Sequence, residues 1–432
     1  MVTFPNYISK YLANFCKIVY NNTMKKYDIA IIGGGAAGMM AAIIASRSDK
    51  KVVLIEKNAV LGRKILATGN GRCNLTNRNA TLDHYHGLDS NFIKQVLSQF
   101  DSEQTIKYFQ NIGLILKEED NGRIFPRTNQ SSSVVNLLKH KLFEAKVDLL
   151  LDTEVKEIGK TSDGSFSMAL SSGEAIESDK LIITTGGKAS YFLGSSGDGY
   201  FFATNFGHKI VPIAAALVPV ETGEKWPKDV QGVKVEAKVS LYVDGSLVNE
   251  RTGDLLFTHY GLSGPAVMSQ SRIIGRLFDK HKIEFRIDLF PEIQTKELDA
   301  LVATNFEKNG KQNVKNALLG ILPESMIGLI LKLAKIDPTK KSAEISRIAR
   351  LEAVKLMKEL VVTVSTLRSI KEAQVTSGGI STDEISPETM ESKIVKNLYF
   401  AGEVLDVDGD SGGYNLQWAW SSGFVAGNNS SK

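Results

Sequence analysis

Residues 27–56, YDIAIIGGGAAGMMAAIIASRSDKKVVLIE, decide the fold. A β-branched apolar run leads into Gly33-Gly34-Gly35-Ala36-Ala37-Gly38, which has the form G-x-G-x-x-G, and an alanine-rich segment follows. A second strand-like run, residues 51–55, has four apolar residues after Lys51 and leads into Glu56, which stands 18 residues after Gly38. This order predicts a buried strand, a glycine turn, a helix, a second strand and a terminal acid, which together are typical of a dinucleotide-binding unit.

The turn and the acid each have a physical role in holding a dinucleotide. Gly33 permits the tight turn, Gly35 lets the backbone approach a pyrophosphate, and Gly38 lets the helix pack closely on the strand. The helix N-terminus then faces the phosphates. Glu56 is expected to accept hydrogen bonds from the adenosine ribose, and an acid here favours an unphosphorylated ribose, hence FAD or NAD rather than NADP.

The composition of the 432 residues fits a globular protein of two or three domains. An apolar fraction of 43% and a charged fraction of 23% argue against disorder, and a net charge of +4 is no nucleic-acid-binding signature. Two cysteines exclude a disulfide framework and predict a reducing compartment, so we expect a cytoplasmic protein. The excess of 37 glycines over 10 prolines favours backbone that approaches a ligand.

Two segments raise the question of a membrane. Residues 29–45 are uncharged, but three consecutive glycines split them, so strand, turn and helix replace a membrane span. Residues 1–23 are open to three interpretations: an interfacial membrane helix, a docked terminal helix, or a segment that precedes a natural start at Met24. We favour the last, and we expect no membrane partner.

Metal sites are not expected. His84 and His86 form a close pair without a ligand cluster nearby, which favours surface or capping roles. The acids within residues 403–410 lack the twelve-residue spacing and final Glu of a calcium loop.

The segment 61–77, LGRKILATGNGRCNLTN, distinguishes between the dinucleotides. A plain NAD dehydrogenase would continue into another crossover helix, whereas this glycine-rich polar loop favours FAD, with a polar surface loop as the alternative. Arg63-Lys64 can offset phosphate charge, and Asn70 and Asn74 can contact the flavin ring or the substrate. A redox role for Cys73 is disfavoured because no C-x-x-C partner exists.

Two later segments end in glycine as the first strand does. Residues 180–187, KLIITTGG, predict a strand that returns to the sheet, and Val155 is expected beside the adenine. Residues 397–403, NLYFAGE, predict another strand, whose final acid can bind a ribityl hydroxyl. A helix opening within residues 412–417 and running through Ala426 would direct its N–H groups at flavin N1–C2=O, where negative charge develops on reduction.

The middle of the chain reads as an insertion. Residues 200–290 look strand-rich, and residues 295–360 look helical. One helix face is predicted from Ile327, Ile330, Leu331 and Ala334, and a second from Ile345, Ile348, Leu351 and Val354. There is no second strand–G-x-G-x-x-G–helix unit in this region, so any NAD(P)H is expected to bind transiently over the flavin.

Four longer strings resemble one known family. They are GRKILATGNGRCN (62–74), LFTHYGLSGP (256–265), VTSGG (375–379) and AGEVLDVDGDSGGYNLQ (401–417). They look like the BaiN/RdsA-type NAD(P)/FAD-dependent flavoproteins, which include the aminoacetone-oxidase-like proteins, and the resemblance spans roughly residues 25–430. It implies an α/β fold in which a Rossmann-like FAD-binding domain is split by an inserted β-barrel-like domain and a helical domain. The predicted domains are an N-terminal extension (1–23), the first part of the FAD-binding domain (24–195), a β-rich insertion (196–292), a helical insertion (293–360), and return strands with the second part of the FAD-binding domain (361–432).

The motifs and the resemblance together define the candidate site residues. The cofactor-binding candidates are Gly33, Gly35, Ala36, Ala37, Gly38, Glu56, Lys57, Arg63, Lys64, Gly69, Asn70, Gly71, Cys73, Asn74, Val155, Thr185, Gly186, Gly187, Gly402, Glu403, Asp406, Gly413, Tyr414, Asn415 and Leu416. The catalytic candidates are Asn70, Arg72, His259 and Tyr414, because each stands in a motif expected to meet the flavin. For His259, ordinary interdomain hydrogen bonding is the alternative.

The leading functional hypothesis is an FAD-dependent oxidoreductase. Hydride transfer at flavin N5 would link NAD(P)H to a small unsaturated or carbonyl-containing substrate, and no nucleic-acid partner is expected. An amine oxidase that uses O₂ is one alternative. A flavin-dependent non-enzymatic or RNA-modification partner is another, and the oligomeric state is left open.

Overall fold

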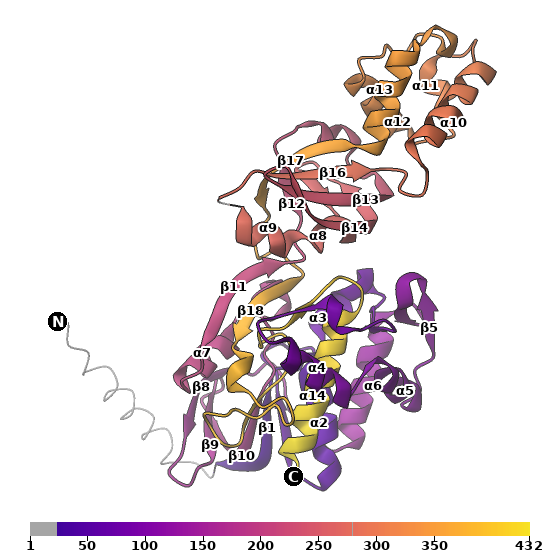
Figure 1. The fold of residues 1–432 in the computed structure, drawn as a ribbon. Helices are drawn as coiled ribbons and strands as arrows, with labels where there is room; N and C mark the ends of the chain where they lie inside the picture. Colours follow the sequence, from indigo (N-terminus) through magenta and orange to yellow (C-terminus); the bar gives the residue numbers. More distant parts are fainter. Residues whose placement is uncertain (1–23, 279) are drawn as a thin grey trace, which may run out of the picture. The chain divides into compact units, whose positions relative to one another are not determined.

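The computed structural model describes residues 24–278 and 280–432, which form two compact units (Figure 1). Unit 1 takes the residues up to Ile213 and then Val375–Lys432, and unit 2 is Ala214–Gln374. Each unit has its own hydrophobic core. The predicted N-terminal extension, residues 1–23, lies outside the described residues.

Unit 1 is built on a mainly parallel sheet. Its strand order is β7 (Asp148–Leu150), β2 (Val52–Ile55), β1 (Lys25–Ile32), β10 (Ala175–Ile183), β9 (Phe166–Leu170) and β8 (Val155–Lys160). The first four strands run parallel, while β9 and β8 form an antiparallel extension. All four residues of β2 are buried, as expected for a central parallel strand covered on both faces.

The last strand of the sheet comes from the far end of the chain. β19 (Leu398–Phe400) pairs in parallel with residues 181–183 of β10, while β9 pairs with residues 175–178 of the same strand. β19 therefore enters the sheet beside the carboxyl end of β10. Because the parallel strands end at one edge, the segments after β1, β2, β10 and β19 all meet there, although they are far apart in sequence.

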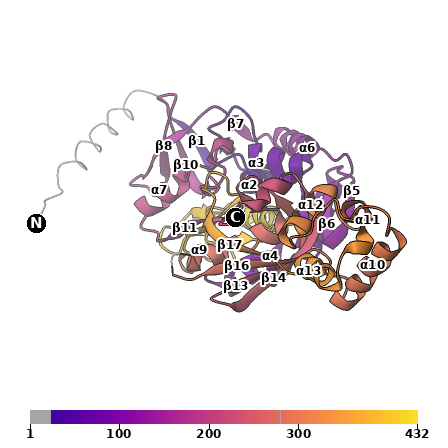
Figure 2. The same ribbon diagram turned by 90° about the horizontal axis from the view of Figure 1, so that it is seen from above.

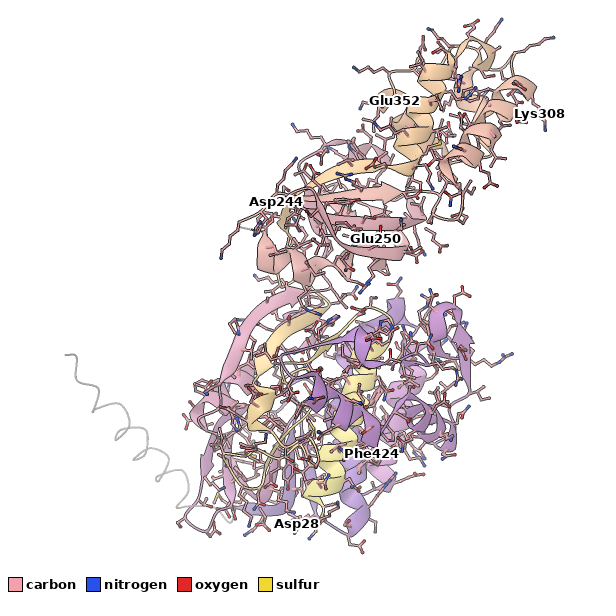
Figure 3. All side chains as sticks on the ribbon, in the orientation of Figure 1. Asp28, Asp244, Glu250, Lys308, Glu352 and Phe424 are labelled. Atoms are coloured by element: carbon pink, nitrogen blue, oxygen red, sulfur yellow. The ribbon has the colours of Figure 1, made fainter. Side chains whose placement is uncertain are left out.

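Helices and short strand pairs surround this sheet. The helices are α2 (Ala36–Ala45), α3 (Arg63–Ala67), α4 (Ser90–Gln99), α5 (Ser102–Asn111), α6 (Ser131–Glu144), α7 (Asp198–Asn205) and α14 (Tyr414–Ser430). The short sheets pair β3 (Thr76–Asn77), β6 (Arg123–Pro126) and β5 (Leu116–Glu119), then β4 (Tyr85–His86) with β20 (Asp408–Gly409), and β11 (Ile210–Ala216) with β18 (Val375–Ile380). Phe424 lies on α14 (Figure 3). Its ring stacks on that of Phe100, with 4.3 Å between the ring centroids.

Unit 2 is a closed barrel that carries helices (Figures 1 and 2). Its strands are β12 (Val220–Thr222), β15 (Gly261–Ser263), β14 (Ser246–Phe257), β13 (Lys234–Val243), β16 (Ile283–Asp288) and β17 (Leu360–Leu367). Its helices are α8 (Pro265–Met268), α9 (Ser271–Leu277), α10 (Thr295–Lys308), α11 (Val314–Ala317), α12 (Glu324–Leu333) and α13 (Arg347–Lys358). The predicted α/β class, with a Rossmann-like domain split by a barrel and helices, is confirmed.

The division into two units does not test the boundaries of the five predicted domains. Contacts divide the chain after Ile213 and after Gln374, and β17 belongs to the barrel. The separation of a β-rich insertion (196–292) from a helical one (293–360) stays a prediction. None of the helices within 24–278 and 280–432 combines the length and apolar character that crossing a bilayer requires.

Candidate functional site

The N-terminus of α2 lies at the carboxyl edge of the sheet. Gly33 has φ +106°, and a Cβ there would come within 2.5 Å of the Thr184 carbonyl oxygen. A Cβ on Gly38 would lie 1.9 Å from the Gly33 carbonyl oxygen, so strand and helix touch through glycine. A Cβ on Gly35, by contrast, would have no described atom within 4 Å. The backbone is therefore open at the position where the sequence places a pyrophosphate.

The start of α2 carries unsatisfied donors. Gly35 is its N-cap, and within the described chain no side chain caps the helix and no acid stands in its first turn. Ala36 and Ala37 begin the helix, whose first N–H groups and dipole favour an anion. This end of α2 fits a phosphate-bearing ligand.

Glu56 stands at the end of β2, next to α2. Its carboxylate is buried and accepts hydrogen bonds from the backbone N–H groups of Gly34, at 2.7 Å, and Asn58, at 2.9 Å. One pocket is lined by residues that include Gly33, Glu56, Lys57, Val155 and Thr185. It combines a carboxylate with an apolar wall, which fits an adenosine.

Two basic side chains near this pocket are already engaged with protein groups, whereas one hydroxyl is not. Lys57 Nζ lies 2.6 Å from Asp198 Oδ2, and Arg63 Nη1 donates to Asn58 Oδ1 at 2.5 Å. Thr185 Oγ1 is buried and has no hydrogen-bond partner among the described atoms. The phosphate role predicted for Arg63 stays a prediction.

A second uncapped helix start belongs to α14. Gly413, its N-cap, has φ +101°, and a Cβ there would lie 2.5 Å from the Thr76 carbonyl oxygen and 2.9 Å from Asn74 Oδ1. Asn74 Oδ1 is buried, and no described group donates to it. A buried acceptor without a donor is costly, so a ligand N–H at this place would satisfy it. Leu416 lies half-buried in the first turn of α14.

The two helices lie side by side, with staggered starts (Figure 1). A Cβ on Gly423 would lie 2.5 Å from the Ala37 carbonyl oxygen, and a Cβ on Gly427 would lie 2.5 Å from that of Ala41. Residue 37 thus lies beside residue 423, and residue 41 lies beside residue 427. Because both numbers rise together, the two helices run in the same direction. At 1.5 Å per residue, α14 begins about 12 Å before α2 along the axis. An FAD, which is negatively charged at its pyrophosphate and, when reduced, at its ring, would fit two such starts.

The loop after β19 links both ends of the chain. Gly402 has φ +82°, and a Cβ there would lie 3.0 Å from the Ala37 side chain. Glu403 Oε2 pairs with Lys64 Nζ at 2.5 Å, while its Oε1 accepts the Thr376 N–H at 2.8 Å. Asp406 is buried and accepts the Leu88 N–H at 3.2 Å.

Thr376, on β18, is a residue that the sequence reasoning missed. Its hydroxyl accepts the backbone N–H groups of Lys188, at 2.8 Å, and Ala189, at 2.9 Å. A Cβ on Gly187 would lie 2.2 Å from this hydroxyl, and Gly186 has φ +76°. Thr376 therefore fixes the loop after β10 and, through its N–H, the carboxylate of Glu403. Its signal was the VTSGG string, which served only to support the family resemblance.

The glycine-rich loop after α3 is tightly shaped. Gly69, Asn70 and Gly71 have φ values of +58°, +55° and +80°, and all three are exposed. Cys73 is fully buried, and burial raises the pKa of its thiol to about 12, so it stays protonated at neutral pH.

Arg72 is held by protein groups. Its guanidinium pairs with Glu119, donates to Asn129 Oδ1 and lies 4.2 Å from the centroid of the Phe125 ring. These contacts describe a side chain that fastens the loop to β5 and β6, and the predicted catalytic role of Arg72 stays a prediction. His259 lies in unit 2, between β14 and β15, with its ring 4.9 Å from that of Tyr260. Its predicted role also stays a prediction.

Tyr414, the first residue of α14, belongs to a cluster that the sequence did not indicate. Its ring stacks on His84, with 4.3 Å between centroids and 16° between planes. His84 Nδ1 lies 3.2 Å from Asp410 Oδ2, and His86 Nε2 lies 2.9 Å from Asp410 Oδ1. The side chain of Asn415 exchanges hydrogen bonds of 2.8 Å with the backbone N–H and carbonyl of Gly409. The surface or capping roles expected for the histidines are therefore incomplete, because both pair with a buried carboxylate.

Within residues 24–278 and 280–432, no group of three or more His, Cys, Asp and Glu side chains is arranged to hold a metal ion.

Comparison with known proteins identifies the family. The sequence profile described as "HI0933-like protein Rossmann domain" matches residues 27–429. The chain is 37% identical to the 3-dehydro-bile acid delta(4,6)-reductase of Clostridium scindens, covering 92% of this chain and 98% of that one. It is 32% identical to the ribosomal RNA dihydrouridine synthase of Escherichia coli, covering 93% and 97%.

A solved structure shares the fold. It is the 3-ketosteroid delta1-dehydrogenase from Sterolibacterium denitrificans, with a TM-score of 0.51 and 12% identity over 94% of this chain and all of that one. At that identity the likeness concerns the fold alone.

The resemblance inferred from the four sequence strings is thus confirmed, and with it the prediction of an FAD-dependent oxidoreductase. The helix starts, the Glu56 pocket and the unsatisfied Asn74 oxygen are the features of this chain that fit the cofactor. The chain belongs to the HI0933-like Rossmann-domain family of flavoproteins, the BaiN/RdsA type.

Proposed function

We propose that this protein is an NAD(P)H-linked, FAD-dependent reductase of a carbon–carbon double bond conjugated with a carbonyl group in a small molecule. The observation that carries the proposal is the pair of uncapped, staggered helix starts, with the unsatisfied Asn74 Oδ1 beside the second. They fit the two anionic positions of an FAD whose ring is reduced.

The names of the relatives support the choice of reaction. One is named for reducing 3-dehydro-bile acids at delta(4,6), and the other for making dihydrouridine in ribosomal RNA. Dihydrouridine is uridine whose ring double bond, conjugated with a carbonyl, has been reduced. The two products look unrelated, yet both reactions add a hydride and a proton across the same kind of bond.

FAD, when bound, supplies the hydride chemistry. The α2 start and Glu56 would hold the pyrophosphate and ribose, and the α14 start would offset negative charge at the ring. Burial, with a smaller effect of Asp410, raises the pKa of Tyr414 to about 12. Its hydroxyl is therefore protonated at neutral pH and can donate the proton that the substrate carbon needs. The proposal includes a nicotinamide as the hydride donor. It also includes a cytoplasmic location, which is inferred from the two cysteines of the sequence.

Reduction of a uridine within RNA is the second candidate function. The specific observation in its favour is the second relative, which this chain matches over nearly its whole length. A nucleic-acid partner, which the net charge did not predict, is therefore one outcome that the test includes.

The test is anaerobic stopped-flow with the full-length, FAD-loaded protein. We expect NADH or NADPH to bleach the flavin, and a 4-en-3-one steroid to restore its absorbance. Bleaching by amines alone, with recovery in O₂, would identify an amine oxidase instead. Recovery with unmodified ribosomal RNA but not with the enone, together with new dihydrouridine by mass spectrometry, would establish the second candidate.

The Tyr414→Phe variant tests the proton donor. Bleaching by NAD(P)H should stay within a few-fold of the original rate, while recovery with the enone should slow by about 10²-fold or more. Tyr191→Phe, at an exposed tyrosine of unit 1, is the matched control. Equal recovery rates in Tyr414→Phe and the control would remove Tyr414 from the reaction.

A further inference from the structure

The cluster of His84, His86 and Asp410 is built into the fold. β4 and β20 pair antiparallel, which sets His86 opposite Asp408, and the Asp410 N–H donates to the His84 carbonyl at 2.9 Å. The Asp410 carboxylate then spans both imidazoles, at 3.2 and 2.9 Å. The Asp410 side chain is 8% exposed, whereas those of His84 and His86 are 36% and 29% exposed. A buried charge is thus paired with two groups that reach solvent.

This cluster lies at the start of α14. His84 stacks on Tyr414, the first helical residue, and the Tyr85 hydroxyl donates to the Tyr414 carbonyl at 3.1 Å. Asn415 holds the turn at Gly409, one residue before Asp410. Any charge that develops at the helix start therefore acts on the histidine pair across a short, partly buried distance.

The titratable groups around the histidine pair are tyrosines, carboxylates and one lysine. Burial raises the pKa of Tyr85 well above its usual value and that of Tyr414 to about 12. Asp83 and Asp408 adjoin the cluster along the chain, and Asp406 precedes it. β18, which packs on β20, has no titratable side chain, and α4 contributes Lys94, which is exposed.

We propose that the pair His84 and His86, sharing the Asp410 carboxylate, takes up one proton from solvent when a flavin at the start of α14 is reduced. The inference rests on the proposed position of FAD, though not on the proposed substrate. Two electrons and one proton arrive as a hydride from a nicotinamide. The second proton forms one imidazole N–H bond, so two electrons and two protons are taken up in all. Negative charge beside the pair is what favours the imidazolium.

The experiment measures the two-electron midpoint potential of the full-length, FAD-loaded protein against pH, using dithionite and redox mediators. Over one range of pH, reduction of the flavin should add a proton to the histidine pair. In that range the slope of midpoint potential against pH should be steeper by about 30 mV per pH unit than it is outside the range. The double variant His84→Gln/His86→Gln should lose this steeper segment. His140→Gln, which removes an exposed histidine paired with Glu144, should keep it.

Two results would overturn the inference. One is a uniform slope in the unaltered protein from pH 5 to 9, which needs no variant to fold. The other is a steeper segment that survives in the double variant. Because dithionite replaces the nicotinamide and no substrate is present, a protein that NAD(P)H fails to bleach would refute the proposed function and leave this measurement intact.

Discussion

At Gly35 the backbone leaves room that no described side chain fills, and its φ of −80° is one that any residue adopts. Gly35→Asp should therefore fold. Aspartate is a favourable N-cap, so the apo protein should lose no stability, while its carboxylate would occupy the place of an anion. We expect the flavin-to-protein absorbance ratio of the purified variant to fall at least tenfold.

The control for this prediction is Gly320→Asp. Gly320 is an exposed glycine of unit 2, where a Cβ likewise meets no described atom within 4 Å. It should bind FAD as the unaltered protein does. Full flavin occupancy in Gly35→Asp would place the pyrophosphate elsewhere.

His208 predicts how stability depends on pH. Its ring is buried between Glu384, whose Oε2 lies 3.2 Å from Nδ1, and Ser392, whose Oγ lies 2.8 Å from Nε2. Burial lowers the pKa of His208 below its usual value, and Glu384 opposes this only in part. The neutral ring therefore contributes stability that is fully present above about pH 6.5 and is lost as the pH falls towards the folded-state pKa.

Thermal unfolding between pH 5 and 8 measures this effect. The melting temperature of the unaltered protein should fall below pH 6.5, and in His208→Gln that fall should be smaller. His140→Gln, at an exposed position, should show the unaltered profile. Parallel profiles for the unaltered protein and His208→Gln would assign the acid sensitivity to other groups.

At the scale of elements, the contact of α2 with α14 depends on glycine. A Cβ at Gly427 would lie 2.5 Å from a backbone oxygen of α2, which no rotamer relieves. Gly427→Val should therefore separate the helices, lower the free energy of unfolding by about 1–3 kcal/mol, and reduce FAD occupancy because the two helix starts shift.

Urea unfolding of the apo protein provides the measurement. Gly328→Val is the matched control, because Gly328 also lies within a helix, α12, but a Cβ there meets no described atom within 4 Å. It should be neutral or stabilising, since valine is the better helix former. Equal effects of the two substitutions would show that the glycine contact is not what holds α2 against α14.

The helices of unit 2 show where periodicity succeeds. On α12 the predicted face is confirmed, with Ile327, Ile330 and Leu331 buried. On α13 it is wrong in part, because Ile348 is 82% exposed and Ala353, Val354 and Met357 form the buried face. The α13 prediction used steps of three residues only, and each such step turns about 60° away from the starting face. Three steps turn about 180°, so the four residues cannot share one side.

At the scale of the whole molecule, the turns at the ends of the parallel strands could be predicted from the sequence, whereas the contacts made by short strand pairs could not. Glycine turns after β1, β10 and β19 mark the sheet edge, because such turns are local signals. His84 and Asp410 are 326 residues apart, and the strands that join them are two residues long, too short for any alternating pattern. The VTSGG string marked the position of Thr376 but not its role, since the partners of Thr376 lie in other loops.

Unit 1 should bind FAD without unit 2. Every cofactor-binding candidate lies in unit 1, which has a hydrophobic core of its own. Of the catalytic candidates, only His259 lies in unit 2. The chain leaves unit 1 on β11 and returns to it on β18, and these two strands pair with each other. A Cβ on Gly378 would lie 2.2 Å from the Pro212 carbonyl oxygen. Because the two strands are this close, a short linker can replace residues 214–374.

We expect this deletion variant to be yellow, to have an unfolding transition of its own, and to lose turnover with the enone. Flavin absorbance, circular dichroism and steady-state assays measure the three properties. A folded but colourless variant would show that unit 2 takes part in holding the cofactor.

β19 and α14 enter unit 1 from the far end of the chain, and this fixes the order in which the two units can be completed during synthesis. Ribosomes extend chains from the N-terminus, and domains generally fold as units as they emerge. Unit 2 is continuous and is complete before Val375 is added, whereas β19, which flanks β10, and the start of α14 are made after it. Residues 181–183 of β10 therefore have no partner on this flank until β19 has been made, and we expect FAD to bind only after α14 has been added.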